Sequence, residues 1–470
     1  MPRKKKKKHS PLIVYLFTSM LIITSIIIGL IYFIDILPFN YFALLSGLIL
    51  VIDLVFTVLL FSSKPFVKVI GGLFTTAYIL LMILGIIYEL NTIDFLKKIG
   101  EKEYITLNYN VVVLKSSDYT DLPSIKGEKV GIVSGTREEV TTKLNKKVNV
   151  KYNTYSNYSE LVDKLINKHI KVIILEDSQY SILEEEYDGF ENKVSVIYKF
   201  TVDVKQKAEK NKTNITKKPF NIFISGIDTY GNINSVSRSD VNMIMTVNPL
   251  DKKIVLTSIP RDYYVKLAGI NEYDKLTHAG IYGIDTSIDT VETLLDTKIN
   301  YYIKVNFSSL VKVVNTFDGI DVDSKYEFKS QDGYSFKKGI NHLNGKQALS
   351  FVRERKALPD GDRSRGENHQ AVLAAIINKA SSTNVLTNYN SILKSLKPSL
   401  VTNLSNKEIT SFIKMQIDKD IKWDISYVNL DGSDGYEYTY SYAKNKLYVM
   451  IPDEETVEAA KEAISKVLEK

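Results

Sequence analysis

The 470-residue chain contains no cysteine. That absence excludes disulfide frameworks, thiolate metal sites and cysteine nucleophiles. Histidine is scarce as well: the five histidines show no HxH or HxxxH spacing, so a zinc site made of histidines is not expected. The sequence also has no Walker-type glycine loop and no serine, histidine and acid arrangement. Chemistry in this protein therefore has to rest on other side chains.

The composition is otherwise that of a folded protein. Hydrophobic residues make up 44% of the chain and charged residues 24%, which is close to ordinary globular usage. At about 150 residues per domain, the length predicts two to three domains. A single small module and a disordered chain are both excluded.

The net charge of +7 is unevenly distributed along the chain. Residues 1–88 hold eight basic and two acidic side chains, which leaves 53 basic and 52 acidic groups in residues 89–470. The larger part therefore lacks the basic surface that DNA-binding domains show, and no nucleic-acid partner is expected. The surplus of positive charge belongs to the N-terminal end.

Three long apolar stretches near the N-terminus predict membrane-spanning helices. Residues 12–34 and 69–88 carry no charge, and residues 39–61 carry one acid, Asp53. Each stretch is long enough to cross a hydrocarbon core of about 30 Å as a helix. A secretory signal peptide has one short apolar core, so three in succession predict a retained anchor. We expect Asp53 to pack against a neighbouring span.

Basic residues set the expected orientation of these spans. The run 3–8 and the link 62–68 contain lysines and are expected on the cytoplasmic side. The first link, residues 35–40, has no lysine or arginine and is expected outside. Three spans then place everything after Tyr88 on the extracytoplasmic side of the cell membrane, with the N-terminus in the cytoplasm.

Residues 104–203 alternate strand and helix patterns, which predicts a small α/β accessory domain. Strands are expected at 106–114, 129–133 and 172–175, and a helix is expected at 158–168. The turn Ser134-Gly135-Thr136 could bind an anion at the following helix or could be an ordinary turn. This unit has a faint similarity to half of an extracellular solute-binding protein, which bears only on its fold class.

A second domain follows a polar, lysine-rich linker. It begins with a strand at 221–226, and a turn at 248–251 separates two strands that are adjacent or form a hairpin. Four helical patterns follow, at 286–295, 308–317, 344–352 and 366–380. Two strand patterns lie between them, at 301–305 and 320–322. This interleaving predicts an α/β fold with a mixed central sheet and helices on both faces.

These patterns divide the chain into six parts. They are a basic N-terminus (1–11), three transmembrane helices (12–88), the accessory domain (98–203), a linker (204–218), the main domain (219–385) and a C-terminal extension (386–470). The extension could be an appended cap or part of the main domain. Its tyrosine-rich stretch, 436–442, could pack in a sheet or stack on sugars. A terminal amphipathic helix is expected from Asp453.

Arginine positions are the most informative feature of the sequence. Only eight of the 61 basic residues are arginine, and six of these lie in one part of the chain. The planar guanidinium binds phosphate or carboxylate through two parallel hydrogen bonds, which lysine cannot reproduce. Each of the six also has an acid nearby, so a structural ion pair is the alternative for any single one. The six are Arg238, Arg261, Arg353, Arg355, Arg363 and Arg365.

Several of these charged residues stand next to predicted strands. Asp228 follows the first strand of the main domain, and Arg261 follows the strand at 254–258. Ligands gather at the carboxyl ends of strands in open α/β sheets, so these positions are expected to converge. Asp228 and Asp240 could hold Mg²⁺ beside a phosphate, or they could simply neutralise the arginines. Arg365 is expected at the start of a helix, where free N–H groups favour an anion.

A series of short motifs carries a resemblance to a known family. The motifs are Gly226-Ile-Asp228, Arg238-Ser-Asp240, Ser258-Ile-Pro-Arg-Asp262, Lys275-Leu-Thr-His-Ala-Gly280, Phe317-Asp-Gly-Ile-Asp-Val322, Leu343-Asn-Gly-Lys-Gln-Ala-Leu349 and Phe351-Val-Arg-Glu-Arg355. In order and spacing they resemble the LytR-CpsA-Psr family over roughly residues 220–381. The three spans and the additional domain ahead of the motifs are similar to its capsule-associated CpsA branch.

The resemblance implies a phosphotransferase that moves a capsular or similar glycopolymer from a polyprenyl diphosphate of the undecaprenyl type onto peptidoglycan and releases polyprenyl phosphate. It implies Mg²⁺ or Mn²⁺ as cofactor, the membrane as setting and other polysaccharide-assembly membrane proteins as partners. Charge developing on phosphoryl oxygens could be stabilised by arginines and a metal ion in fixed positions.

The resemblance also implies roles for particular residues. The metal would be held by Asp228 and Asp240, and the catalytic residues would be Arg238, Arg261 and Asp240. The diphosphate would be bound by Arg261, Lys275, Arg353, Arg355, Arg365, His369 and Gln370. Where the family usually has Arg-Gln-Gln, this chain has Asn368-His369-Gln370, so the chain departs from the family pattern here.

Two other functions fit the same sequence. A polyprenyl diphosphate hydrolase would use the same site with water as acceptor. A non-catalytic lipid-binding regulator would act through partner proteins in the membrane. A transcriptional role is not expected, because only about ten residues precede the first span, too few for a DNA-binding fold.

Overall fold

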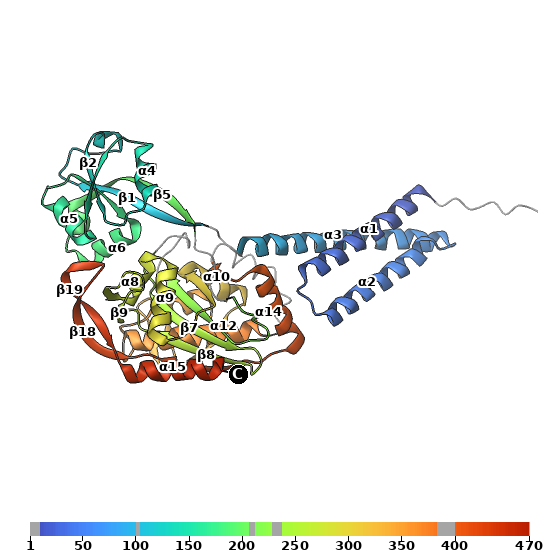
Figure 1. Ribbon diagram of the computed structural model, residues 1–470. Helices are drawn as coiled ribbons and strands as arrows, with labels where there is room; N and C mark the ends of the chain where they lie inside the picture. The colour runs from blue at the N-terminus through green and yellow to red at the C-terminus, as the bar shows by residue number, and fades with distance from the viewer. Residues whose placement is uncertain (1–9, 100–103, 206–211, 228–236, 383–399, 470) are drawn as a thin grey trace, which may run out of the picture. The chain divides into compact units, whose positions relative to one another are not determined.

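A computed structural model describes residues 10–99, 104–205, 212–227, 237–382 and 400–469 (Figure 1). Within it the chain forms two compact units, which are described separately. The first unit comprises residues 1–100, 381–397 and 404–422, and the second comprises residues 101–380, 398–403 and 423–470.

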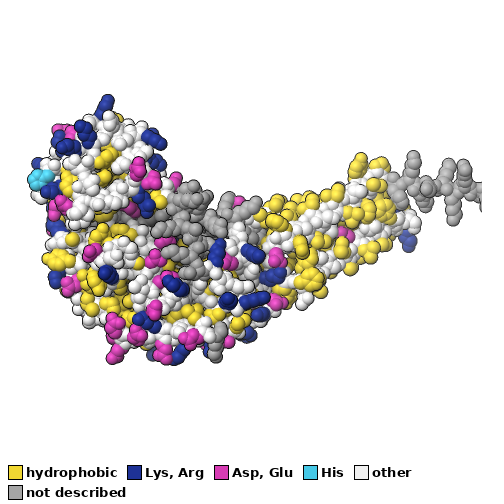
Figure 2. Space-filling view, viewed as in Figure 1, with side chains coloured by type: hydrophobic (Ala, Val, Ile, Leu, Met, Phe, Trp, Pro, Cys, Tyr) yellow, Lys and Arg dark blue, Asp and Glu magenta, His cyan; other side chains and the backbone are white. Residues whose placement is uncertain are grey.

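The first unit contains three helices that are long and apolar enough to cross a membrane, as the sequence predicts. They are α1 (Pro11–Ile34), α2 (Phe39–Leu60) and α3 (Pro65–Ile99). Figure 2 shows hydrophobic side chains along the outside of these helices, which is the surface that lipid would contact. Asp53 is buried within this unit. The basic run 3–8 lies outside the described residues, so the orientation stays a prediction.

Helix α14 (Asn406–Lys419) belongs to the same unit. Ser405 caps its first turn by accepting a hydrogen bond from the backbone N–H of Glu408, whose side chain returns a bond to the N–H of Ser405. Lys414 forms an ion pair with Asp35 at the end of α1, with 2.6 Å between Nζ and Oδ1. Residues far apart in the sequence are thus joined in one helical unit.

The accessory domain forms the N-terminal part of the second unit. Its five-stranded sheet has the order β3-β2-β4-β1-β5, with β2 parallel to β3 and β4 and with β1 antiparallel to β4 and β5. Its elements are β1 (Tyr104–Leu114), β2 (Lys129–Val133), α4 (Glu138–Asn145), β3 (Lys151–Tyr155), α5 (Tyr158–Ile166), β4 (Val172–Glu176), α6 (Asp177–Glu186), α7 (Phe190–Lys193) and β5 (Val194–Lys205). The predicted strands and helix are all present.

The main domain contains a six-stranded mixed sheet in the order β16-β11-β6-β7-β8-β17. Its strands are β6 (Phe220–Ile227), β7 (Val241–Asn248), β8 (Lys253–Ile259), β11 (Tyr301–Asn306), β16 (Leu400–Thr402) and β17 (Asp424–Asn429). Strands β7 and β8 pair antiparallel across a short turn, so the predicted pair is a hairpin. Burial of every residue of β6 explains its nearly continuous apolar sequence.

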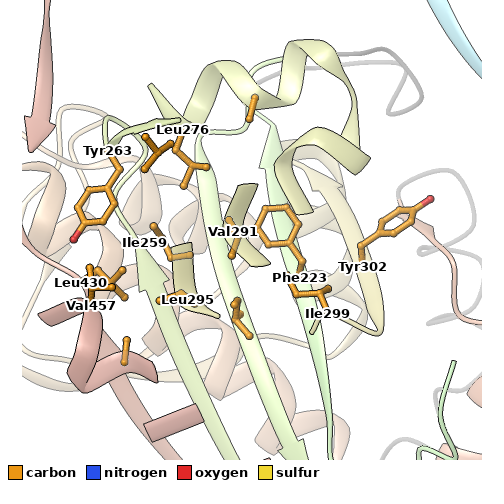
Figure 3. Close-up of a cluster of buried hydrophobic side chains, with 14 of the residues drawn as sticks. Phe223, Ile259, Tyr263, Leu276, Val291, Leu295, Ile299, Tyr302, Leu430 and Val457 are labelled. Atoms are coloured by element: carbon orange, nitrogen blue, oxygen red, sulfur yellow. The ribbon is translucent and has the colours of Figure 1, made fainter. Parts of the chain in front are cut away.

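The helices of the main domain pack in two separate hydrophobic clusters, of which the first includes residues of the six-stranded sheet. One cluster joins Phe223 of the sheet to Val291 of α9 (Ile284–Leu295) and Val457 of α15 (Glu454–Leu468) (Figure 3). A second cluster contains residues of α10 (Phe307–Thr316), α11 (Gly345–Arg353) and α12 (Asp362–Ala380). The mixed sheet with packed helices confirms the predicted fold class.

The C-terminal region is an integral part of the main domain. Strand β17 pairs in parallel with β8, and α15 joins the main hydrophobic cluster. Between them, β18 (Gly432–Thr439) and β19 (Tyr442–Pro452) form a two-stranded antiparallel hairpin. The smaller elements of this domain are β9 (Tyr264–Lys266), β10 (Tyr273–Lys275), α8 (Leu276–Ala279), β12 (Ile320–Ser324), β13 (Phe328–Lys329), β14 (Ser335–Phe336) and β15 (Gly339–Leu343).

Candidate functional site

A cavity of about 450 Å³ opens at one edge of the six-stranded sheet. Strands β8 and β17 both end at this edge, and the antiparallel β7 begins there. This is the edge where ligands gather in open α/β sheets. The charged residues that line the cavity are Asp240, Arg261, Asp360, Asp362, Arg363, Arg365, Glu367 and Asp431. Asp240, Arg261 and Arg365 thus lie together at this edge, whereas Asp228, which the sequence predicts to converge with Arg261, lies outside the described residues.

Arg261 is the central cation of the cavity. Its Nη1 donates a hydrogen bond of 2.7 Å to Oδ1 of Asp240. Its Nε is buried without a hydrogen-bond acceptor among the described residues, although Asp262 Oδ2 lies 3.5 Å away. Burial acts against the charge of Arg261, but Asp240, Asp262 and Asp362 outweigh it and raise its pKa. The guanidinium thus stays charged in the lining of the cavity.

Asp362 connects three arginines around the cavity. Its Oδ1 lies 3.0 Å from Nη2 of Arg365, 3.8 Å from Nε of Arg355 and 3.9 Å from Nε of Arg261. The same oxygen is buried and accepts no hydrogen bond of good geometry within the described part of the chain. Asp362 begins α12, four residues before the predicted start, where a carboxylate is favoured by the helix dipole. The sequence places Asp362 beside Arg363 and Arg365 as an ion-pair acid, but it does not predict the contact with Arg261 and Arg355.

The loop between α11 and α12 is shaped by Glu354. Burial disfavours the charge of this carboxyl, but hydrogen bonds from the backbone N–H groups of Ala357, Gln331 and Arg355 outweigh burial and lower its pKa. A charged Glu354 therefore fixes the loop that carries the exposed side chains of Arg353 and Arg355. The guanidinium carbon of Arg353 lies 4.9 Å from the ring centroid of Phe307.

Lys275 lies beside the cavity and is bound to one of the acids next to Arg261. Its Nζ is 3.3 Å from Oδ1 of Asp262, and the side chain is largely buried. The preceding residue, Asp274, is fully buried and contacts Nδ1 of His278 at 2.6 Å. Lys275 is thus held in place, but it is not among the residues that line the cavity.

Arg238 has a partner that the sequence does not suggest. It forms an ion pair with Glu185 of α6, in the accessory domain. The backbone next to it is closely packed, since a Cβ on Gly280 would lie 2.6 Å from the carbonyl oxygen of Ser237. Among the described residues, Arg238 therefore shows no contact through which it would support Asp240 as the resemblance implies.

His369 and Gln370 differ in position. His369 lines the cavity, and burial together with the charge of Arg365 lowers its pKa to about 3, so its imidazole is neutral near neutral pH. Gln370 is buried and donates from Nε2 to the carbonyl oxygens of Leu256 at 2.8 Å and Val428 at 2.9 Å. Its amide connects β8 to β17, and these contacts argue against the predicted phosphate contact. Gln370 is the next residue of α12 after His369, so its side chain points to the sheet and not into the cavity.

The donor atoms of the cavity suit a hard cation that shares oxygens with a phosphate. Five carboxylates line it against three arginines, so a diphosphate would need further positive charge. Asp228 lies outside the described residues, and among the described ones no group of three or more His, Cys, Asp or Glu surrounds a common point. Mg²⁺ commonly takes one or two carboxylates plus phosphate oxygens, so the available residues fit it.

Comparison with known proteins assigns the family. The sequence profile of the LytR_cpsA_psr family matches residues 187–465. The chain belongs to this family. The matched range includes every cavity-lining residue described above, and it extends through β17, the β18–β19 hairpin and most of α15.

Named relatives in this family are about two fifths identical to this chain over the aligned residues. The Enterococcus faecalis protein named polyisoprenyl-teichoic acid–peptidoglycan teichoic acid transferase TagU is 39% identical over 209 residues, which is 44% of this chain and 68% of that protein. The Bacillus subtilis TagU is 38% identical over 206 residues, covering 44% and 66%. The crystal structure of B. subtilis TagV is 32% identical, covers 54% of this chain and 98% of its own, and has a TM-score of 0.45.

These comparisons bear on the expected branch of the family. The relatives are teichoic acid transferases and not capsule-associated proteins. They therefore support the family assignment that the motifs predict, and they do not support the CpsA branch that the three spans and the additional domain suggest. Additional segments ahead of a domain show how it is anchored, whereas the substrate is recognised in the domain itself.

Proposed function

We propose that this protein transfers a glycopolymer from a polyprenyl diphosphate to peptidoglycan at the outer face of the cell membrane. The observation that carries the proposal is the cavity at the sheet edge, where Arg261 and Arg365 converge with Asp240 and Asp362. The names of the relatives favour a polymer of the teichoic acid class over a capsular polymer. Three candidate spans support a lipid-linked donor that is met at the membrane.

In this proposal the arginines bind the diphosphate and stabilise the charge that develops during transfer. The guanidinium of Arg261 would donate to a phosphate oxygen, and Asp240 keeps it in position through Nη1. Arg365 would contact the same group from the first turn of α12. Arg353 and Arg355, which lie on an exposed loop, would reach the outer phosphate or the polymer.

Asp228 and Asp240 would hold Mg²⁺ together with oxygens of the diphosphate. When bound, the ion would neutralise phosphate charge that three arginines facing five carboxylates cannot neutralise alone. The alternative in which the two acids only balance the arginines predicts no metal dependence. Removing Mg²⁺ with a chelator and restoring it distinguishes the two.

A transfer assay with purified full-length protein tests the proposal. The protein in detergent or nanodiscs is incubated with Mg²⁺, a polyprenyl diphosphate glycopolymer and peptidoglycan fragments, and joined product is sought by mass spectrometry. Joined product that disappears with Arg261→Ala supports the transferase. Release of free polymer with acceptor present would indicate a hydrolase, and tight lipid binding without turnover would indicate a regulator.

A further inference from the structure

The hairpin of β18 and β19 carries tyrosine rings on its solvent side. Tyr436 and Tyr438 are 65% and 55% exposed. They are two residues apart in β18, so both point to the same face of the hairpin, about 6.7 Å apart along the strand. Tyr448 lies opposite Tyr436 in β19, with ring centroids 6.0 Å apart. We call these three rings the tyrosine face.

Sheet packing does not account for the tyrosine face. The side chains that point to the opposite side of the hairpin, such as Leu447 and Val449, are buried. Burial of an aromatic ring is favourable, so adjacent exposed rings on one face of a hairpin indicate a surface with a partner. Figure 2 shows hydrophobic side chains, tyrosine included, on the part of the second unit where the hairpin lies.

The hairpin begins at the rim of the cavity. Arg363 and Asp431 both line the cavity, and Arg363 is bonded to Asp431 and to the carbonyl oxygen of Gly432, the first residue of β18. At about 3.3 Å per residue, Tyr436 lies about 13 Å along the strand from that rim. A long chain with one end in the cavity can therefore extend along the tyrosine face.

The hairpin is also held in a fixed position. Ser441, in the turn between its strands, donates from its backbone N–H at 2.8 Å to Oδ2 of the buried Asp274. The hydroxyl of Tyr264 donates to the backbone carbonyl of Tyr438 at 3.0 Å. A surface that is rigid before binding loses less conformational entropy when its ligand arrives.

The charge of the hairpin indicates which polymer it accepts. Residues 431–452 contain three acids and two lysines, so the hairpin carries no positive surplus that would attract a chain of phosphates. Neutral pyranose rings present apolar C–H faces that pack on aromatic rings. We propose that the tyrosine face binds the glycan strand of the peptidoglycan acceptor. This inference rests on the proposed function, because it places the acceptor of that reaction.

A binding measurement on the full-length protein in nanodiscs tests this inference without turnover. The probe is peptidoglycan glycan strands that keep their stem peptides, so that the lactyl groups remain uncharged amides, and that are freed of any attached polymer. We expect Tyr436→Ala/Tyr438→Ala to weaken binding at least about tenfold, and the corresponding double Phe variant to restore it, because the rings carry the contact. Tyr427→Ala, which removes a tyrosine of β17 that is 51% exposed, is the matched control and should bind normally.

Several outcomes would overturn the inference. Equal affinity of wild-type and double Ala protein for the strands would do so, as would a loss confined to poly(glycerol phosphate), which would assign the face to the donor. If the double Ala variant unfolds at a lower temperature, Tyr436→Ala alone is used instead. The transfer assay is read separately: tyrosine-dependent strand binding without transfer would contradict the proposed function and leave the acceptor surface in place.

Discussion

The two sheets of the second unit both end in polar side chains, yet their edges differ in charge and in shape. At the edge of the accessory sheet, β4 ends at Glu176, whose pKa burial raises to about 7 against the opposing effects of Ser178 and Arg137. At the edge of the main sheet, arginines and carboxylates pair around a cavity. A single arginine near a buried acid can only partly offset its burial, whereas paired arginines stay charged and retain donors for a ligand.

The largest effect is expected from the central cation of the main sheet. Arg261→Ala should lower transfer at least about a hundredfold, because charged hydrogen bonds to the diphosphate and the orientation of Asp240 are lost together. Joined product measured by mass spectrometry checks this. Arg137→Ala, at the edge of the accessory sheet, is the matched control and should transfer normally. Wild-type levels of joined product from folded Arg261→Ala would contradict the proposed site.

The carboxylate beside that cation should have the next largest effect. Asp240→Ala should reduce transfer about ten- to a hundredfold and abolish the response to added Mg²⁺, because both a metal ligand and the partner of Arg261 are removed. The rate is measured against Mg²⁺ concentration after chelation. A Mg²⁺ response identical to that of the wild type would show that Asp240 only balances the arginine.

The accessory edge predicts an effect on stability instead of transfer. Because the pKa of Glu176 is raised to about 7 from its ordinary 4.5, the folded state binds more protons than the unfolded state between these values, and stability falls as pH rises from about 4.5 to 7. Glu176→Gln should flatten this dependence and stabilise the protein at pH 8 by about 2 kcal/mol. Thermal unfolding at pH 5 and pH 8 measures it, with exposed Glu138→Gln as control. An unchanged pH profile in Glu176→Gln would show that the carboxyl is not responsible.

The smallest effect is expected where the two domains meet. Glu185→Gln removes the ion-pair partner of Arg238, and such a partly exposed pair contributes about 0.2–1 kcal/mol. The unfolding temperature should hardly change. If Arg238 acts in transfer, releasing its side chain from Glu185 should change the transfer rate by about threefold or less. Glu184→Gln is the neighbouring control and should leave the transfer rate unchanged. A loss as large as that of Arg261→Ala would mean that Glu185 has a direct role.

Local patterns in the sequence predicted most of the elements and part of the site. The three apolar stretches, strands β1, β2 and β4 of the accessory sheet and the β7–β8 hairpin follow from hydrophobic runs and turn residues, which are local properties, whereas β3 and β5 were not predicted. The small number of arginines drew attention to Arg261 and Arg365, because only a guanidinium binds phosphate through two parallel hydrogen bonds. Both residues line the cavity.

Contacts between distant parts of the chain could not be predicted in this way. The pairing of β17 with β8, the bonds of Gln370 to two strands and the pairing of Arg238 with Glu185 all depend on tertiary packing. The role of Asp362 was missed for the same reason, since it comes from three arginines that surround the residue in space. One signal was available: an acid beside two of the rare arginines, Arg363 and Arg365.

The parallel pairing of β17 with β8 has a consequence for how the protein is made. Asn429, Leu430, Asp431 and Thr456 line the cavity together with residues within 240–261 and 360–369, which precede them in the chain. During synthesis and export, the arginines emerge long before the strand and helix that complete their surroundings. In the proposed orientation, the proposed diphosphate site would be complete only after residue 456 has been exported, so we expect a chain interrupted earlier to lack transfer activity.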